Sequence, residues 1–212
     1  DILLLMVCGD VSKHTQFIHD LILVASNREV NDPNLNLYFR DRTAPDATAQ
    51  GTLQMLFELE RWLCEIGGFH AATLQPMAGA HGELTAMLMC KEALEARGEP
   101  ERTEVIVPDS AHGTNPATAS MVGFTTITIP TAADGGVDLD ALREALGPQT
   151  AAVMLTNPST YGLFEARIRE FLDLVHEAGA FAYMDGANLN AILGKFKPGE
   201  AGFDAMHFNL HK

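Results

Sequence analysis

The feature that most constrains the fold is a repeated alternation of short apolar runs with longer amphipathic segments. The run "AATLQP" leads into "GAHGELTAMLMCKEALEARG", where Leu84, Met87, Leu88 and Leu94 recur at helical spacing and Gly98 ends the segment. The same order follows in "EVIVPDS" and "TNPATASMVG", "FTTITIP" and "DLDALREALG", and "AAVMLTNPS" and "EARIREFLDLVHEAG", before "AFAYMDGAN" and "AMHFNLHK". This order predicts an α/β fold in which a mostly parallel sheet carries helices on both faces.

Composition narrows the classes of partner. The chain has 212 residues, of which 47% are hydrophobic, and 14 basic against 28 acidic residues give a net charge of −14. This charge argues against nucleic acid and anionic membrane as partners. Cys8, Cys64 and Cys90 form no C-x-x-C pair and predict reduced thiols, hence a cytoplasmic protein, or a mitochondrial matrix protein in a eukaryote. The opening "DILLLMVCGD" is shorter than the roughly 20 apolar residues of a membrane span and predicts a core strand.

Polar segments follow five of the expected strands. They are "QPMAGAHGE", "PDSAHGTN", "LTNPSTYG", "MDGANLN" and "NLHK". Any one of them taken alone is typical of an ordinary turn, because Gly, Asn, Asp and Pro are turn residues. Ligands of parallel sheets bind at the carboxyl ends of the strands, so the five segments together predict one composite site.

Two ionisable residues lie at these strand ends. Most lysines are solvated surface charges, but Lys212 follows an apolar strand, where a free amine can attack a carbonyl and form a Schiff base. Asp185 ends "FAYMD", where a buried carboxylate requires a cationic partner such as a protonated pyridine nitrogen. Together they predict pyridoxal 5'-phosphate, an aldehyde cofactor that needs a protonated ring nitrogen to act as an electron sink.

The segment "AGAHGE" offers a place for the phosphate. Gly79 permits close backbone approach, and we expect the amides of Ala80, His81 and Gly82 to open a helix whose positive end favours an anion. A nucleotide phosphate would fit a helix start equally well. However, the chain contains neither G-x-x-x-x-G-K-[ST] nor G-x-G-x-x-G, which disfavours a nucleotide.

The histidines allow several interpretations. His112 either stacks on a cofactor ring or hydrogen-bonds within its own loop. His207 and His211 have the spacing of a helical metal pair, but they lie on an expected strand and lack the Glu of that motif, so we expect no metal. A hydrolase triad of Asp109, Ser110 and His112 is excluded, because residues so close in sequence cannot align as nucleophile, base and orienting group.

Long motifs carry a resemblance to a known family. The segments "TLQPMAGAHGELTAML", "VPDSAHGTNPATASMVGF", "MLTNPSTYGLFE", "YMDGANLNAILG" and "GFDAMHFNLHK" closely resemble the decarboxylating glycine dehydrogenases, the pyridoxal-phosphate component of the glycine cleavage system. Within that family the chain looks most like the catalytic half, which many bacteria make as a separate subunit. The resemblance covers residues 46–212, which predicts a partial cofactor-binding large domain, whereas residues 1–45 form an N-terminal segment that does not match.

The resemblance implies the aspartate-aminotransferase-like fold, fold type I, and gives roles to matching residues. Lys212 would be the Schiff-base lysine that holds the cofactor covalently, and Asp185 the partner of its ring nitrogen. His112 would stack on one face of the ring, with Ala187 against the other.

The remaining roles concern the phosphate and the edge of the cofactor ring. The phosphate would be held by Gly79, Ala80 and His81 in the "AGAHG" loop and by His211. Asn157 would lie near the phenolic oxygen of the cofactor or near the substrate.

The implied reaction is the decarboxylation of glycine, with transfer of the aminomethyl group to the lipoyl group of the carrier H-protein. The implied partners are glycine, the H-protein and the other subunit, in a homodimer or heterotetramer. Two alternatives stay open: another fold-type-I enzyme, such as an amino-acid decarboxylase or aminotransferase, and a non-catalytic remnant that only binds a partner subunit.

The sequence departs from the family after the lysine, where the family continues with a threonine and a Gly-rich segment. Lys212 is the last residue here, so we expect a fragment. In the family's fold the strand that follows the lysine lies between the strands matching "AATLQP" and "AMHFN". Without it, we expect two open sheet edges and a chain that is poorly stable alone.

Overall fold

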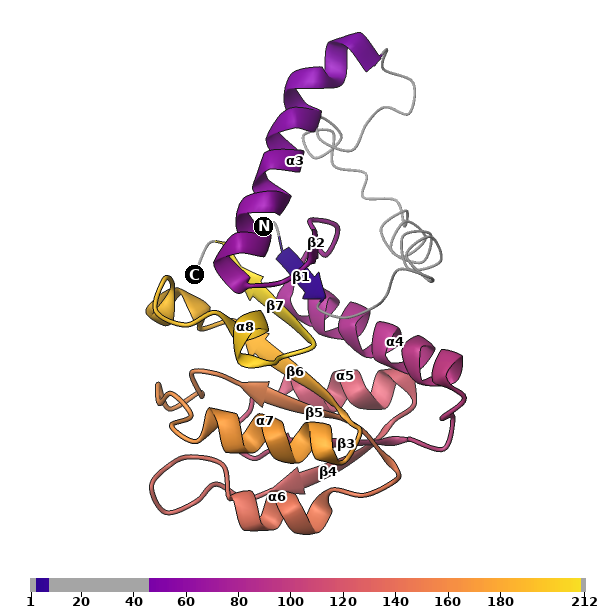
Figure 1. Ribbon diagram of the computed structural model, residues 1–212, viewed down its shortest axis with the longest axis vertical. Coiled ribbons are helices and arrows are strands. Elements are labelled where there is room, and N and C mark those ends of the chain that lie inside the picture. Colours follow the sequence, from indigo (N-terminus) through magenta and orange to yellow (C-terminus); the bar gives the residue numbers. More distant parts are fainter. Residues whose placement is uncertain (1–2, 8–45, 211–212) are drawn as a thin grey trace.

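The computed structural model describes residues 3–7 and 46–210, and the side chains of most residues from Gln50 onward (Figure 1). The strands within these ranges are β1 (Leu3–Val7), β2 (Ala71–Thr73), β3 (Glu104–Pro108), β4 (Thr125–Ile129), β5 (Thr150–Thr156), β6 (Phe181–Gly186) and β7 (Ala205–Asn209). The helices are α3 (Asp46–Gly67), α4 (Gly79–Arg97), α5 (Thr114–Val122), α6 (Leu139–Ala145), α7 (Ile168–Glu177), α8 (Pro198–Ala201) and the 3₁₀ helix η1 (Leu189–Ile192).

The strands of the described ranges form one seven-stranded sheet in the order β2-β1-β7-β6-β5-β3-β4. From β7 to β4 all neighbours are parallel, as the strand and helix alternation predicts. The helix predicted to end at Gly98 is α4, and Gly98 closes it with a left-handed backbone at φ 76°. The predicted α/β fold with a mostly parallel sheet is therefore confirmed.

The strand β1 lies where the family's fold would place the strand that follows the lysine. It pairs antiparallel with both β2 and β7, so that Leu5 is opposite Thr73 on one side and His207 on the other. Our expectation of open edges at β2 and β7 is therefore wrong, because β1 supplies hydrogen-bonding partners to both. The prediction that the opening run forms a strand is confirmed for residues 3–7.

The core has two layers, one on each face of the sheet. In β3, Val105 and Val107 pack in the cluster under α4 and α5, whereas Ile106 packs in the cluster under α6 and α7. This follows from the two-residue period of a strand, which sends alternate side chains to opposite faces. Tyr183 in β6 belongs to the α4 and α5 layer, so Asp185, two residues later, points to the same face. That face carries the candidate site.

The long helix α3 has no counterpart among the elements expected from the sequence. Its C-terminal part packs on the sheet through Leu63, while its N-terminal part extends away from the rest of the described chain (Figure 1). Leu53, Phe57 and Trp62 are exposed on it. No helix in the described ranges is both long and apolar enough to span a membrane.

An ionisable pair attaches α7 to the sheet. The Nε2 atom of His176 lies 3.1 Å from Oδ2 of Asp204, and the same oxygen accepts a hydrogen bond of 2.8 Å from the amide of Ala182 in β6. The hydrogen bond to Asp204 raises the pKa of His176 above its ordinary value of 6.5, although partial burial acts in the opposite direction.

This pair predicts a pH-dependent contribution to stability. Because the pKa of His176 is higher in the folded than in the unfolded chain, the stabilisation is fully present below about pH 6.5 and is lost as the pH rises through the folded value. We expect His176→Gln in the full-length chain to be less stable than the parent at acidic pH and to approach it at alkaline pH. Denaturant midpoints measured across this range check the prediction.

Glu177→Gln, an exposed change on the same helix, serves as the control and should keep the pH dependence of the parent. A His176→Gln variant whose difference from the parent is the same at every pH would contradict the prediction.

Candidate functional site

The centre of the candidate site is the carboxylate of Asp185, which is 1% exposed at the end of β6. Its Oδ1 accepts the amide hydrogen of Ala187 at 3.0 Å, and its Oδ2 accepts a hydrogen bond from Nδ2 of Asn115 at 3.0 Å. The Nε2 atom of His207 in β7 lies 3.3 Å from Oδ1. Three donors from three different segments therefore fix this carboxylate before any ligand is added.

His207 connects Asp185 to a tyrosine deeper in the same layer. The hydroxyl of Tyr183 contacts Nδ1 of His207, and both side chains are 1% exposed. Burial, and then the charges of Asp185 and Glu83, raise the pKa of Tyr183 well above its ordinary value of 10, so its hydroxyl stays protonated and donates. Nδ1 of His207 therefore accepts, which leaves Nε2 to carry the hydrogen that faces Asp185.

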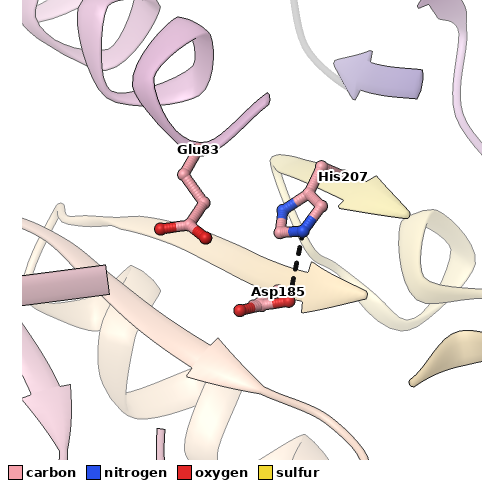
Figure 2. A group of neighbouring side chains, drawn as sticks. All are labelled: Glu83, Asp185 and His207. Carbon is pink, nitrogen blue, oxygen red and sulfur yellow. Dashed lines mark ion pairs between the residues drawn. The ribbon is translucent and has the colours of Figure 1, made fainter. Parts of the chain in front are cut away.

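A second buried carboxylate, Glu83, comes from the first turns of α4 and is 2% exposed. Figure 2 shows Glu83 converging with Asp185 and His207, and one ligand atom from each lies within 4.8 Å of the others. A metal ion is disfavoured, because both nitrogens of His207 already serve as hydrogen-bond partners of Tyr183 and Asp185. Within the described part of the chain, neither carboxylate pairs with a Lys or Arg. Such a site is complementary to a cationic group on a ligand.

His112 lies in the loop between β3 and α5. Its amide donates to Oγ1 of Thr156 at 3.0 Å, and that hydroxyl donates to Oδ1 of Asn115 at 3.4 Å. The loop is thereby linked to the residue that holds Asp185. The ring of His112 is exposed, and its Nδ1 lies 2.6 Å from Oγ1 of Thr114, so the ring makes the kind of local contact that the alternative interpretation allowed. Stacking on a cofactor stays a prediction.

The start of α4 lies beside the same part of β7. A Cβ atom placed on Gly79 would lie 3.6 Å from Nε2 of His207 and 3.9 Å from Oδ1 of Asn209. The helix has no side-chain cap, and helix geometry leaves the amides of Gly79 and Ala80 without an acceptor inside the helix. These are the residues that the "AGAHG" motif predicts for an anion.

Two of the amides predicted for the anion have other partners. The amides of His81 and Gly82 donate to the carbonyl of Ala78 at 3.0 and 3.1 Å, because they already belong to the first helical turn. The ring of His81 is also engaged, since its Nδ1 accepts the amide hydrogen of Met77 at 3.1 Å. Burial lowers the pKa of His81, which favours the neutral ring that this acceptor role needs.

Beside the start of α4, Asn209 places a buried polar atom without a partner in the described part of the chain. Its side chain is buried in β7 on the same face as His207, and its Oδ1 has no hydrogen-bond partner among the described residues. A buried amide without a partner is rare in folded proteins. Because the O and N atoms of an asparagine amide are interchangeable in assignment, this side chain can present either a donor or an acceptor to a ligand beside Gly79.

Not every predicted residue joins this group. Asn157 is buried at the end of β5, and its Oδ1 accepts the amide hydrogen of Glu165 at 3.1 Å, on the α6 and α7 side of the sheet. Its neighbour Thr156 is the residue at this strand end that hydrogen-bonds to Asn115. Lys212 and His211 lie outside the described residues.

Five residues of the network were not predicted as site residues from the sequence: Glu83, Asn115, Thr156, Tyr183 and His207. Asn115 and Thr156 lie within the quoted motifs "SAHGTNPA" and "MLTNPS", which was the available signal. Glu83, Tyr183 and His207 lie within quoted motifs too, but in segments typical of an ordinary helix and of ordinary buried strands, so only the structure gives them a role.

Gly186 is required for close contact between β6 and β7 beside Asp185. A Cβ at this position would overlap the carbonyl oxygen of His207 and Cε of Met206. We therefore expect Gly186→Ala to lower the free energy of unfolding by at least about 2 kcal/mol, because backbone atoms must move. Denaturant unfolding of the full-length chain measures this change.

Gly147→Ala is the matched control, since nothing lies within 4 Å of a Cβ at that position. Its free energy of unfolding should stay within about 0.5 kcal/mol of the parent. Equal effects of the two substitutions would show that the contact at Gly186 is not tight.

The parallel sheet from β7 to β4, with helices on both faces and a buried acid at the end of β6, defines the large domain of the aspartate-aminotransferase-like fold, fold type I. Residues 82–212 match the family described as aminotransferase class-V. The chain belongs to this family.

Curated relatives narrow the family to one kind of enzyme subunit. The chain is 58% identical over 168 residues to a protein of Desulforamulus reducens named "Probable glycine dehydrogenase (decarboxylating) subunit 2", and 55% identical over 173 residues to one of the same name from Thiobacillus denitrificans. These alignments cover 79% and 82% of this chain, but only 35% and 36% of the relatives. The resemblance read from the motifs is confirmed, and the chain spans about a third of the length of these relatives.

Solved structures agree on the fold. An inhibitor-bound glycine decarboxylase (P-protein) of the glycine cleavage system aligns with a TM-score of 0.61 at 24% identity, over 86% of this chain and 38% of that chain. A sphingosine-1-phosphate lyase of Burkholderia pseudomallei aligns with a TM-score of 0.52 at 23% identity, over 86% and 41%.

Proposed function

We propose that this chain forms the cofactor-binding part of an enzyme that decarboxylates glycine and transfers the remaining aminomethyl group to the lipoyl group of a carrier protein. The observation that supports this reaction most strongly is the 58% identity to a relative named as a decarboxylating glycine dehydrogenase subunit. The identity extends over 168 residues, far beyond a single motif. The reaction of the whole enzyme also depends on segments that lie outside this chain's alignment.

The site fits pyridoxal 5'-phosphate at two separate points. The buried carboxylate of Asp185 suits a protonated ring nitrogen, and the uncapped start of α4, beside Oδ1 of Asn209, unpartnered among the described residues, suits a phosphate. Lys212 would hold the cofactor covalently, with His112 and Ala187 on the two faces of its ring. His211 would add a contact to the phosphate. When bound, the cofactor supplies an electron sink for the bond that breaks to the carboxylate of glycine.

The residues around Asp185 fix the position and orientation of its carboxylate. Asp185 keeps a proton at the ring nitrogen, and His207 with Tyr183 holds the Asp185 carboxylate in a fixed orientation. Asn115 ties this carboxylate to the His112 loop through Thr156. Burial around Asp185 keeps water away, which strengthens each of these interactions.

Partners follow from the same proposal. The relatives are named as a second subunit, which supports a complex with another subunit, and the reaction needs a lipoyl carrier protein. Homodimers or heterotetramers would serve as assemblies. The described cysteines, Cys64 and Cys90, are free thiols, which supports a cytoplasmic location.

The proposal is tested on the full-length protein, assembled with its partner subunit and pyridoxal phosphate. We expect borohydride to fix the cofactor on Lys212 alone, as mapped by mass spectrometry. We also expect exchange of labelled carbon dioxide into glycine that depends on a lipoylated carrier protein. Lys212→Ala should abolish both results, while Lys195→Ala, an exposed lysine, should leave both unchanged.

The alternatives give different results. Decarboxylation of another amino acid without any carrier protein would indicate a different fold-type-I enzyme. Cofactor scattered over surface lysines, with no exchange, would contradict the proposed function and favour a non-catalytic role.

A further inference from the structure

We propose that Glu83 is a positioning residue that acts on His112 through the hydroxyl of Thr114 and fixes both the tautomer and the orientation of that ring. The functional consequence rests on the proposed function, because His112 is the residue expected against the cofactor. The tautomer itself can be measured without cofactor, so the two statements can fail separately.

Two threonine hydroxyls contact Glu83, and one of them also contacts His112. Thr114 Oγ1 lies 2.6 Å from Oε1 of Glu83, and Thr118 Oγ1 lies 3.2 Å from Oε2. The same oxygen, Oγ1 of Thr114, also lies 2.6 Å from Nδ1 of His112. One hydroxyl therefore bridges a buried carboxylate and an exposed imidazole.

Counting hydrogens decides which way the bridge runs. Thr114 Oγ1 donates its single hydrogen to Oε1 of Glu83, and Thr118 Oγ1 donates its own to Oε2. The oxygen of Thr114 then has only lone pairs left for His112. A contact of 2.6 Å between this oxygen and Nδ1 requires that Nδ1 carry a hydrogen and donate it.

A competing contact favours the opposite tautomer. The amide of Thr114 lies 3.3 Å from Nδ1 of His112, and this interaction needs Nδ1 as an acceptor. It is longer than the hydroxyl contact by 0.7 Å and lies beyond the usual range of about 2.7–3.2 Å for an N–H donor. The shorter hydroxyl contact is the stronger hydrogen bond, so the bridge to Glu83 determines the tautomer.

The consequence for the site is a fixed ring plane. His112 is exposed, and its ring nitrogen Nδ1 contacts both the hydroxyl and the amide of Thr114. Without the bridge, the ring can rotate about its side-chain bonds, and a bound ligand would have to order it. A ring that is already oriented avoids this entropic cost when the ligand binds. Glu83 thereby links helix α4, where the phosphate is expected, to the loop that faces the ring.

The experiment is ¹⁵N NMR of the histidine rings in the full-length protein without cofactor, at a pH where the ring is neutral. The signal of His112 is assigned from its loss in His112→Asn. We expect the parent to show hydrogen on Nδ1. Thr114→Ser keeps the hydroxyl and should keep this tautomer, whereas Thr114→Val removes the hydroxyl and should shift the ring toward the Nε2 tautomer.

Two further variants locate the origin of the effect. Glu83→Gln should shift the tautomer in the same direction as Thr114→Val. Thr118→Val removes a donor to Glu83 that does not touch His112, and it should leave the tautomer unchanged. If Glu83→Gln fails to fold, as judged by circular dichroism, the Thr114 pair alone decides the result.

Cofactor binding gives the functional measurement. We expect Thr114→Val to raise the dissociation constant of pyridoxal phosphate about tenfold, which corresponds to about 1.4 kcal/mol, and Thr114→Ser to restore it. Glu83→Gln combined with Thr114→Val should bind no more weakly than Thr114→Val alone, because both remove the same bridge.

Three results would overturn the inference. They are a Thr114→Val variant that keeps the parent tautomer, a parent ring with hydrogen on Nε2, and equal shifts in all variants including Thr114→Ser and Thr118→Val. A parent protein that binds no pyridoxal phosphate would contradict the proposed function, while the tautomers of the cofactor-free protein would still decide this inference.

Discussion

The structure depends on holding one buried carboxylate, that of Asp185, in a fixed orientation on one face of the sheet. An unpaired buried carboxylate is strongly unfavourable, and three donors hydrogen-bond to this one: the amide of Ala187, the side-chain amide of Asn115 and the imidazole of His207. Each donor comes from a different segment of the chain. The carboxylate thereby ties β6, β7 and the start of α5 together, and its environment is suited to a positive charge brought by a ligand.

The parallel sheet makes this arrangement possible. Because side chains alternate along a strand, Tyr183 and Asp185 face the same side of β6, and His207 and Asn209 face that side of β7. Helices α4 and α5 cover this side and bring Glu83 and Asn115 to it. The other side is filled by an apolar layer under α6 and α7, which supplies stability but no polar group of the network.

The sequence was sufficient to predict the strands β2 to β7 and the helices α4 to α7 in their order, since periodicity and Gly98 mark them directly, but it did not predict α3, η1 or α8. It also identified Asp185, because a carboxylate at the end of "FAYMD" cannot be buried without a partner. It could not predict Glu83 or His207, since their importance arises from contacts between α4, α5 and β7 that no local pattern encodes. It assigned the anion to the amides of Ala80, His81 and Gly82, of which the first helical turn engages the last two. The pairing of β1 between β2 and β7 is likewise a long-range contact that the opening run alone does not specify.

The measurement that tests the central claim most directly is the ¹⁵N chemical shift of the ring nitrogen in labelled pyridoxal phosphate bound to the full-length enzyme. The account predicts a protonated nitrogen at neutral pH, held by Asp185, and an unprotonated nitrogen when Asp185 is replaced by asparagine. An unprotonated nitrogen in the parent enzyme, or the same state in both proteins, would contradict the role assigned to the buried carboxylate.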